Sequence, residues 1–188
     1  MKVALYGGTF NPPHNGHLHV ADEVYRLLHV DQIFFIPAFI PPHKSPYGII
    51  AADARIDMVK AAIADKPFCA VSDIEVMSGQ VCYTIDTVRT IKSEHPEWDD
   101  LYFIIGSDSI PDIYTWKQCE VLCQEVTIVV VKRPGYYSAQ HDKRFVYLDN
   151  VPCAASSTEI RSTIRNGHVP EDLMPPAVVD YIKKHSLY

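Results

Sequence analysis

The sequence predicts an α/β fold of the Rossmann-like, doubly wound type, in which a parallel sheet lies between two helical layers. Short apolar runs alternate with longer amphipathic patterns along the chain, as is typical of βαβ units. The first apolar run ends in a glycine-rich turn, Gly7-Gly8. Open parallel sheets bind ligands at the carboxyl ends of their strands, so we expect a site at this turn.

In the first half of the chain, the sequence predicts two strands, two helices and a loop. The strand Lys2–Tyr6 is an apolar run stopped by two glycines. The helix from about Gly16 to His29 repeats apolar residues on one face, and Ile33–Pro37 is a second apolar strand. Residues 38–50 contain three prolines and are expected to form a loop. Apolar periodicity then predicts a helix over Ala52–Ala64.

The second half follows the same alternation. Strand Phe68–Ser72 precedes helix Thr84–Glu94, which a following proline ends, and strand Leu101–Ile105 is closed by a glycine. The remaining expected elements are helix Trp116–Leu122, strands Val126–Val131 and Phe145–Leu148, and helices Ser157–Asn166 and Pro176–Lys184.

Composition places the chain among ordinary globular proteins. It has 188 residues, 47% apolar and 21% charged, with a net charge of −6. This length predicts a single domain over residues 1–188, and the composition excludes disordered and collagen-like chains. The acidic balance disfavours a nucleic-acid partner that coats the surface.

The cysteines and apolar runs indicate the compartment. There are five cysteines and no CxxC pair, so we expect small buried hydrophobic residues in a reducing cytoplasm. The N-terminal apolar run is too short for a signal peptide. The other apolar runs are too short to cross a bilayer, so no membrane partner is expected.

The turn GGTFNPPHNGH, residues 7–17, combines features of a phosphate site. Glycines allow close backbone approach, and a helix N-terminus attracts anions. His14 and His17 can both donate hydrogen bonds to phosphate oxygens. The GxGxxG and GxxxxGK[ST] patterns are absent. A plain turn with two surface histidines is the alternative.

A second candidate phosphate site is SSTEIR, residues 156–161. Ser156 and Glu159 have the spacing of a capping box. The hydroxyls of Ser157 and Thr158, together with Arg161, would make an anion site at the helix start. An ordinary capped helix is the alternative. In a doubly wound sheet both motifs can converge on one crevice.

These two motifs resemble those of the HxGH nucleotidyltransferase superfamily. The resemblance implies that His14 and His17 contact ATP phosphates, with His17 nearest the α-phosphate, and that Thr9 lies beside the attacking phosphate. Asn11 stands where many members have Asp. SSTEIR resembles the superfamily's ISSTxIR element, with Ala155 in place of the usual apolar residue.

Four further segments bear on the second substrate: PPHK at 41–44, CYTIDT at 82–87, IGSD at 105–108 and YTW at 114–116. Lysine fixed by prolines can grip a phosphate, and bare helix N–H groups can hold a carboxylate. An Asp after a strand can bind ribose hydroxyls, and a tryptophan face suits a planar ring. Each also has an ordinary structural explanation: a solvated loop, a plain N-cap, a turn or a core residue.

Together with KRPG at 132–135, these segments resemble bacterial nicotinate-nucleotide adenylyltransferases over essentially the whole chain. The resemblance implies adenylyl transfer from ATP to nicotinate mononucleotide in NAD biosynthesis, with Mg²⁺ carried mainly by phosphates and water and no metal site on the protein. The residues implied for ATP are Gly7, Gly8, Thr9, Phe10, Gly106, Arg133, Ser157, Thr158 and Arg161, beside the catalytic His14 and His17. Those implied for the mononucleotide are Thr9, Lys44, Thr84, Ile85, Asp108, Tyr114 and Trp116.

Three alternatives stay open. Another adenylyl- or cytidylyltransferase of the superfamily shares the HxGH element, but pantetheine-phosphate adenylyltransferases are not expected to carry YTIDT beside a tryptophan. A non-catalytic nucleotide-binding module need not keep both histidines and Arg161. An RNA-binding relative of class I tRNA synthetases would carry a lysine-rich second motif. The sequence also leaves open whether the chain forms a homo-oligomer and how strongly it prefers nicotinate over nicotinamide.

Overall fold

The computed structural model describes residues 1–40, 48–132, 142–148 and 155–188. Within these residues it contains a six-stranded sheet in the order β3-β2-β1-β4-β5-β6, and every neighbouring pair is parallel. This is the strand order of the Rossmann fold, and it confirms the predicted fold class. The strands are β1 (Lys2–Gly8), β2 (Gln32–Pro37), β3 (Cys69–Val71), β4 (Asp100–Gly106), β5 (Thr127–Val131) and β6 (Val146–Leu148).

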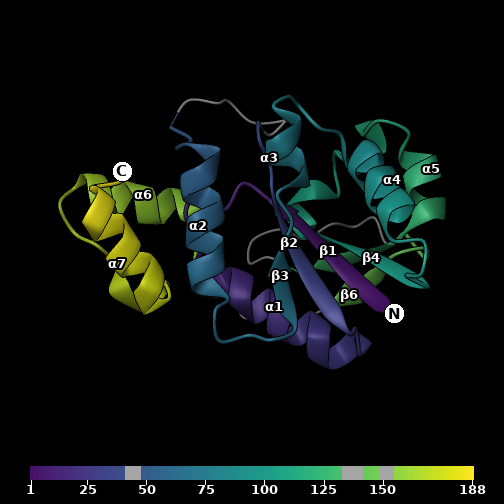
Figure 1. The fold of residues 1–188 in the computed structure, drawn as a ribbon, viewed down its shortest axis with the longest axis horizontal. Helices are drawn as coiled ribbons and strands as arrows, with labels where there is room; N and C mark the ends of the chain where they lie inside the picture. Colours follow the sequence, from purple (N-terminus) through teal and green to yellow (C-terminus); the bar gives the residue numbers. More distant parts are fainter. Residues whose placement is uncertain (41–47, 133–141, 149–154) are drawn as a thin grey trace.

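Helices cover both faces of the sheet (Figure 1). They are α1 (Asn15–Leu28), α2 (Ala52–Ala62), α3 (Ile74–Ser78), α4 (Thr84–Glu94), α5 (Cys119–Glu125), α6 (Ser157–Arg165) and α7 (Pro176–His185), with short 3₁₀ turns η1 (Ser107–Ser109), η2 (Ile113–Thr115) and η3 (Glu171–Leu173).

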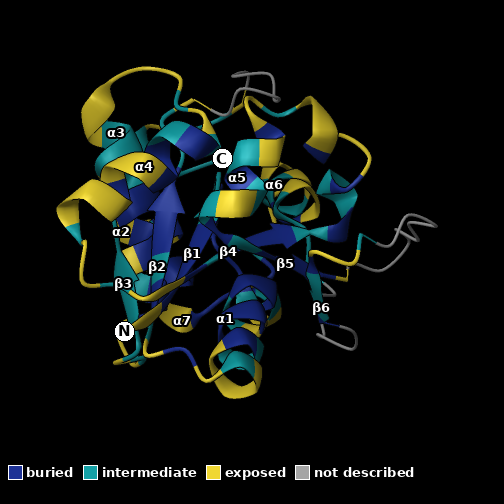
Figure 2. Ribbon diagram, turned by 90° about the vertical axis from the view of Figure 1, so that its right-hand side faces the viewer, coloured by how far each residue is buried: buried dark blue, intermediate teal, exposed yellow. Residues whose placement is uncertain are grey.

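Two hydrophobic clusters separate the layers. In β1, Ala4 and Tyr6 join a cluster with α1, α2, α6 and α7, while Val3 and Leu5 join one with α4 and α5. Successive side chains of a strand point to opposite faces, so a strand buried on both faces reads as a continuous apolar run. Figure 2 shows the central strands largely buried, the edge strands β3 and β6 mainly intermediate, and the outer helix faces exposed.

Two sequence expectations about helices were wrong. The helix expected at Trp116 begins at Cys119, because Gln118 takes a left-handed conformation with φ of 52° that interrupts helical geometry. Helix α3 was not predicted, because its five residues are too few to show a helical periodicity.

The described cysteines are free thiols. Cys119 is buried as expected, whereas Cys69, Cys82 and Cys123 are only half-buried. Burial raises the pKa of Cys69 to about 12 and that of Cys123 to about 11, so these thiols are poor nucleophiles at neutral pH. Cys153 lies outside the described residues. In the described part of the chain, no helix has the length and apolar character needed to span a membrane.

Candidate functional site

The predicted turn lies where the strand order reverses. β1 pairs with β2 on one side and with β4 on the other, and the chain leaves both β1 and β4 at the same edge of the sheet. Thr9 therefore follows β1 close to where Ser107 and Asp108 follow β4. This reversal point is where doubly wound folds bind ligands.

The glycine pair that ends β1 is required by aromatic packing. A Cβ on Gly8 would lie 2.8 Å from the Cζ of Phe10, and one on Gly7 would lie 3.0 Å from the Cζ of Phe103. The Phe10 ring is 2% exposed and contacts Tyr6 edge-on, with ring centroids 5.6 Å apart. Any contact of Phe10 with a nucleotide would therefore use its backbone.

The two histidines are brought together at the start of α1. Their rings stack with centroids 3.7 Å apart and planes 27° apart, and His14 and His17 are 3% and 8% exposed. The backbone N–H of His14 donates to Nδ1 of His17 over 3.1 Å. A neutral His17 then carries its proton on Nε2, which makes Nε2 the donor toward a phosphate oxygen.

The SSTEIR segment docks directly on this turn, as predicted. The Ser157 hydroxyl donates to the Pro12 carbonyl over 2.9 Å, across 145 residues of sequence. Arg161 donates from Nη1 to the Asn11 carbonyl over 2.8 Å and from Nη2 to the Thr158 hydroxyl over 3.3 Å. The helix N-terminus and Arg161 thus lie against the histidine-bearing loop.

The expected capping box at α6 does not form. Among the described residues no side chain caps this helix, although Ser156 occupies the N-cap position and Glu159 the third helical position. The hydroxyl next along the chain, that of Ser157, bonds to Pro12 instead. The spacing alone could not show that a partner distant in sequence would fix the start of α6.

Three of the residues expected to bind the mononucleotide lie in α4 and η1. Thr84 and Ile85 are the first residues of α4, which the described residues leave without a side-chain cap. Ile85 is fully buried, so only its N–H is available to a ligand. Asp108 lies in η1, directly after β4 and its last residue Gly106.

The two aromatic candidates differ in setting. Trp116 is half-buried and packs edge-on against Phe103, with ring centroids 6.5 Å apart. Tyr114 is 45% exposed, and its hydroxyl donates to Asp142 over 2.9 Å. Its expected role in carboxylate recognition would require this hydrogen bond to be exchanged. Lys44 and Arg133 lie outside the described residues.

Comparison with known proteins agrees with this geometry. A cytidylyltransferase-like family model matches residues 5–163. A probable nicotinate-nucleotide adenylyltransferase of Citrifermentans bemidjiense is 38% identical, with 100% of this chain and 98% of the relative covered. One of Thermus thermophilus is 39% identical, with both chains fully covered.

The chain belongs to the nicotinate-nucleotide adenylyltransferase family. It is therefore a nucleotidyltransferase, and the family's activity is adenylyl transfer in NAD biosynthesis. The nicotinic acid mononucleotide adenylyltransferase of Plasmodium falciparum, solved in complex with NaAD, superposes with a TM-score of 0.80. It is 25% identical, and the match covers 100% of this chain and 97% of that one.

Sequence reasoning missed two polar residues behind the turn of this adenylyltransferase, Arg55 and Tyr188. Arg55 is fully buried and donates to the Thr9 carbonyl over 2.8 Å. Tyr188 donates to Oδ1 of Asn11 over 2.9 Å, and burial raises the pKa of this tyrosine. The signal for Arg55 was its place on the apolar stripe of α2, in register with Met58, Val59 and Ala62.

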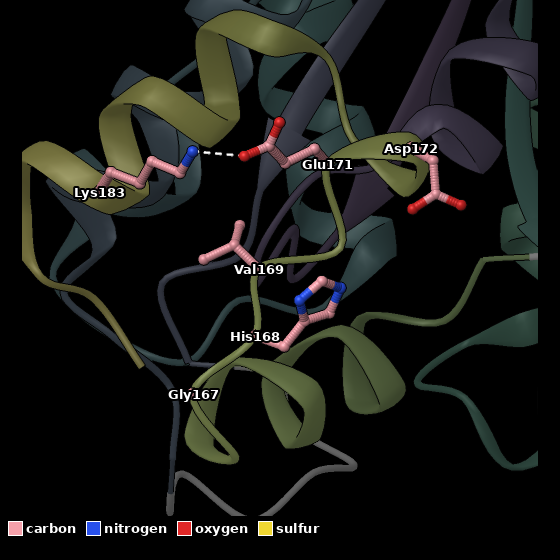
Figure 3. Close-up of a pocket in the computed structure, with 6 residues that line it drawn as sticks. All are labelled: Gly167, His168, Val169, Glu171, Asp172 and Lys183. Carbon is pink, nitrogen blue, oxygen red and sulfur yellow. Dashed lines mark hydrogen bonds and ion pairs between the residues drawn. The ribbon is translucent and has the colours of Figure 1, made fainter.

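A cavity of about 560 Å³ opens between α6, η3 and α7 (Figure 3). Gly167, His168, Val169, Glu171, Asp172 and Lys183 line it, and Lys183 forms an ion pair with Glu171. None of the predicted site residues lines this cavity. One hydrogen bond links the cavity wall to the HxGH turn: the Asn15 side chain donates to the carbonyl of Asp172, a lining residue, over 2.9 Å.

Proposed function

We propose that this adenylyltransferase joins ATP and nicotinate mononucleotide to form deamido-NAD and pyrophosphate. The observation that carries the proposal is the meeting of the two phosphate motifs through the Ser157–Pro12 and Arg161–Asn11 hydrogen bonds. The names of the relatives and the NaAD complex of the Plasmodium enzyme support the choice of substrates.

The reaction is an in-line displacement at the α-phosphorus of ATP. A phosphate oxygen of the mononucleotide forms the new P–O bond, and the bond between the α-phosphorus and the bridging oxygen to the β-phosphate breaks. Pyrophosphate leaves with that oxygen. The attacking phosphate is already ionised near neutral pH, so the enzyme contributes positioning and charge stabilisation.

On the ATP side, His17 donates from Nε2 to the oxygens of the transferring α-phosphate. His14, Arg161 and the starts of α1 and α6 hold the pyrophosphate. Backbone and hydroxyl groups complete this half of the site, and the residues assigned to it are Gly7, Gly8, Thr9, Phe10, Gly106, Arg133, Ser157 and Thr158. The stacked histidines support this division, because they present two rings at one helix N-terminus.

On the mononucleotide side, the N–H groups of Thr84 and Ile85 donate hydrogen bonds to the nicotinate carboxylate at the start of α4, with Tyr114 beside them. The ring of Trp116 stacks on the pyridine, and Asp108 binds ribose hydroxyls. Thr9 and Lys44 hold the attacking phosphate. Preference for nicotinate over nicotinamide then depends on the α4 N-terminus, which favours a negative charge.

Mg²⁺ enters with ATP as part of the substrate. The described residues contain no group of three or more His, Cys, Asp or Glu side chains placed to hold a metal ion. We infer that phosphate oxygens and water hold the ion, where it would neutralise phosphate charge. We further propose that residues 1–188 act as one domain, in the cytoplasm, on small-molecule substrates and without nucleic-acid or membrane partners.

A product assay tests the reaction. Enzyme, Mg²⁺ and ATP are mixed with nicotinate mononucleotide, nicotinamide mononucleotide or phosphopantetheine, and the products are separated by chromatography. Deamido-NAD should form much faster than the other products. Equal rates with both pyridine nucleotides would refute carboxylate recognition at α4, and no pyrophosphate with any acceptor would refute the function.

A variant tests the assigned role of His17. His17→Ala should lower kcat by about 100- to 1000-fold, the usual cost of removing one donor to a developing charge, while the Kd for the mononucleotide changes little. His19→Ala is the matched control, because His19 is an exposed histidine on the same helix. Equal losses in turnover and in mononucleotide binding would contradict the role.

A further inference from the structure

Arg55 is a buried cation whose hydrogen bonds go to backbone carbonyls. It is 0% exposed, and an arginine stays charged in a protein, although burial lowers its pKa. Its donors reach Thr9 over 2.8 Å, Phe39 over 3.1 Å and Ile50 over 3.2 Å. Within the described residues, its side chain donates to these three carbonyl oxygens and to no carboxylate. Burying a charge is costly unless it is hydrogen-bonded, so the guanidinium requires these acceptors in place.

The three carbonyls belong to different parts of the site. Thr9 is in the turn after β1, and Phe39 and Ile50 lie on either side of the PPHK segment in the sequence. A planar guanidinium presents its donors in a fixed fork. One rigid group on α2 therefore sets the spacing between the turn that carries the histidines and the segments that flank PPHK.

The bond to Thr9 also orients the next peptide N–H. In a trans peptide the C=O and N–H point in opposite directions, so a Thr9 carbonyl held by Arg55 directs the Phe10 N–H away from α2. Phe10 itself has φ of 48°, a left-handed conformation that costs a non-glycine residue of order 1–3 kcal/mol. The Arg55 bond helps to hold the turn in this conformation.

A second buried group repeats the same connection. Asn11 donates from Nδ2 to the Gly48 carbonyl over 2.9 Å, and its Oδ1 accepts the Ile50 N–H over 3.3 Å. The turn and the segment before α2 are thus joined twice. Arg55 donates to carbonyls of both, and the Asn11 side chain of the turn bonds directly to Gly48 and Ile50. Arg55 differs in that it also reaches Phe39.

We propose that Arg55 is a positioning residue for adenylyl transfer: its guanidinium holds the substrate-binding turn at Thr9 and Phe10 in register with both segments that flank PPHK. The proposal rests on the proposed function of this site. Arg55 touches no substrate and acts through the backbone groups that do. A misplacement of about 1 Å in reacting groups can cost about 100-fold in rate, and this sets the expected scale.

The test uses Arg55→Lys and Arg55→Gln in the full chain, with Lys60→Met as the control because Lys60 is exposed on the same helix. A lysine keeps the charge but cannot donate in three fixed directions. We expect both variants to fold, to lose about 10- to 100-fold in kcat at a temperature well below Tm, and to change KM by less than kcat. Lys60→Met should match the wild type.

Two results would overturn the proposal. Variants with lowered Tm but wild-type kcat would make Arg55 purely structural, and failure of both variants to fold would do the same. Hydrogen exchange is the readout that does not need activity. Amides of residues 9–10 and 48–50 should exchange faster in Arg55→Lys, while those of α5 should not. If the wild type lacked adenylyl transfer, this exchange pattern would still decide whether Arg55 holds the turn.

Discussion

Replacing Gly8 by alanine tests whether aromatic packing fixes the turn between β1 and α1. The added Cβ would lie 2.8 Å from Cζ of Phe10 and 3.1 Å from both Cε atoms. Carbon atoms pack best at about 3.5–4.0 Å, so the ring or the strand must move by about 0.7 Å. The ring has little freedom to move, because its centroid lies 5.0 Å from that of His17 and 5.4 Å from that of Phe35.

The expected cost follows from overpacking. Such insertions destabilise by about 1–3 kcal/mol, and for a protein of this size 1 kcal/mol lowers Tm by about 2–4 °C. Gly8→Ala should therefore lower Tm by about 2–12 °C. Because the displaced ring contacts His17, kcat should fall as well.

A double-mutant cycle isolates the contact. Leucine at position 10 lacks all three of the ring atoms that the new Cβ would meet, so Phe10→Leu should relieve the clash. The free energies of unfolding, measured by urea denaturation, should show that Gly8→Ala/Phe10→Leu is at least about 1 kcal/mol more stable than the sum of the single effects. Additivity within about 0.5 kcal/mol, as for independent sites, would refute the reasoning.

Two further predictions concern the second motif and Glu75 of α3, whose carboxylate accepts a hydrogen bond from the Thr87 hydroxyl of α4 over 2.8 Å. Arg161→Lys should raise KM for ATP about tenfold or more, because a lysine keeps the charge but cannot bridge Asn11 and a phosphate with a planar fork. Steady-state kinetics checks this, with Arg165→Lys as the control because Arg165 is an exposed arginine of the same helix. Equal KM values for ATP in the two variants would contradict the prediction. Burial raises the pKa of Glu75 above its ordinary 4.5. Between these two pKa values the folded state binds more protons than the unfolded state. The contribution of Glu75 to stability therefore falls as pH rises from about 4.5 through the raised pKa. Glu75→Gln should remove that loss, and urea denaturation at several pH values should show the wild type losing stability relative to the variant over this window; a constant difference would contradict the assignment.

Much of the site was predictable because it depends on strand order and helix starts. The carboxyl ends of parallel strands share an edge, so the turn after β1 and Asp108 after β4 had to lie near each other once the sheet was predicted. The meeting of the HxGH turn with Arg161, which donates to the Asn11 carbonyl, agrees with the same topology. These features depend on local sequence patterns and on the handedness rules of α/β folds.

What escaped prediction depends on contacts between segments distant in sequence. The apolar stripe of α2 contains Arg55, but only the folded chain supplies the three carbonyls that make its burial tolerable. Ser156 and Glu159 satisfy the local rule for a capping box, yet Ser157 takes a partner 145 residues away. In both cases tertiary hydrogen bonds decided the outcome, and sequence spacing carries no record of them.

The prolines of the HxGH turn acquire a physical role from this arrangement. The carbonyls of Asn11 and Pro12, which receive Arg161 and Ser157, both precede a proline and so belong to peptide groups without an N–H. Docking α6 on these two peptides therefore uses no donor that a phosphate could need. The Thr9 carbonyl, held by Arg55, belongs instead to a peptide whose N–H faces the opposite way. The turn is thus fixed to α6 and to Arg55 through backbone acceptors, and two motifs far apart in sequence meet without using the N–H groups of these peptides.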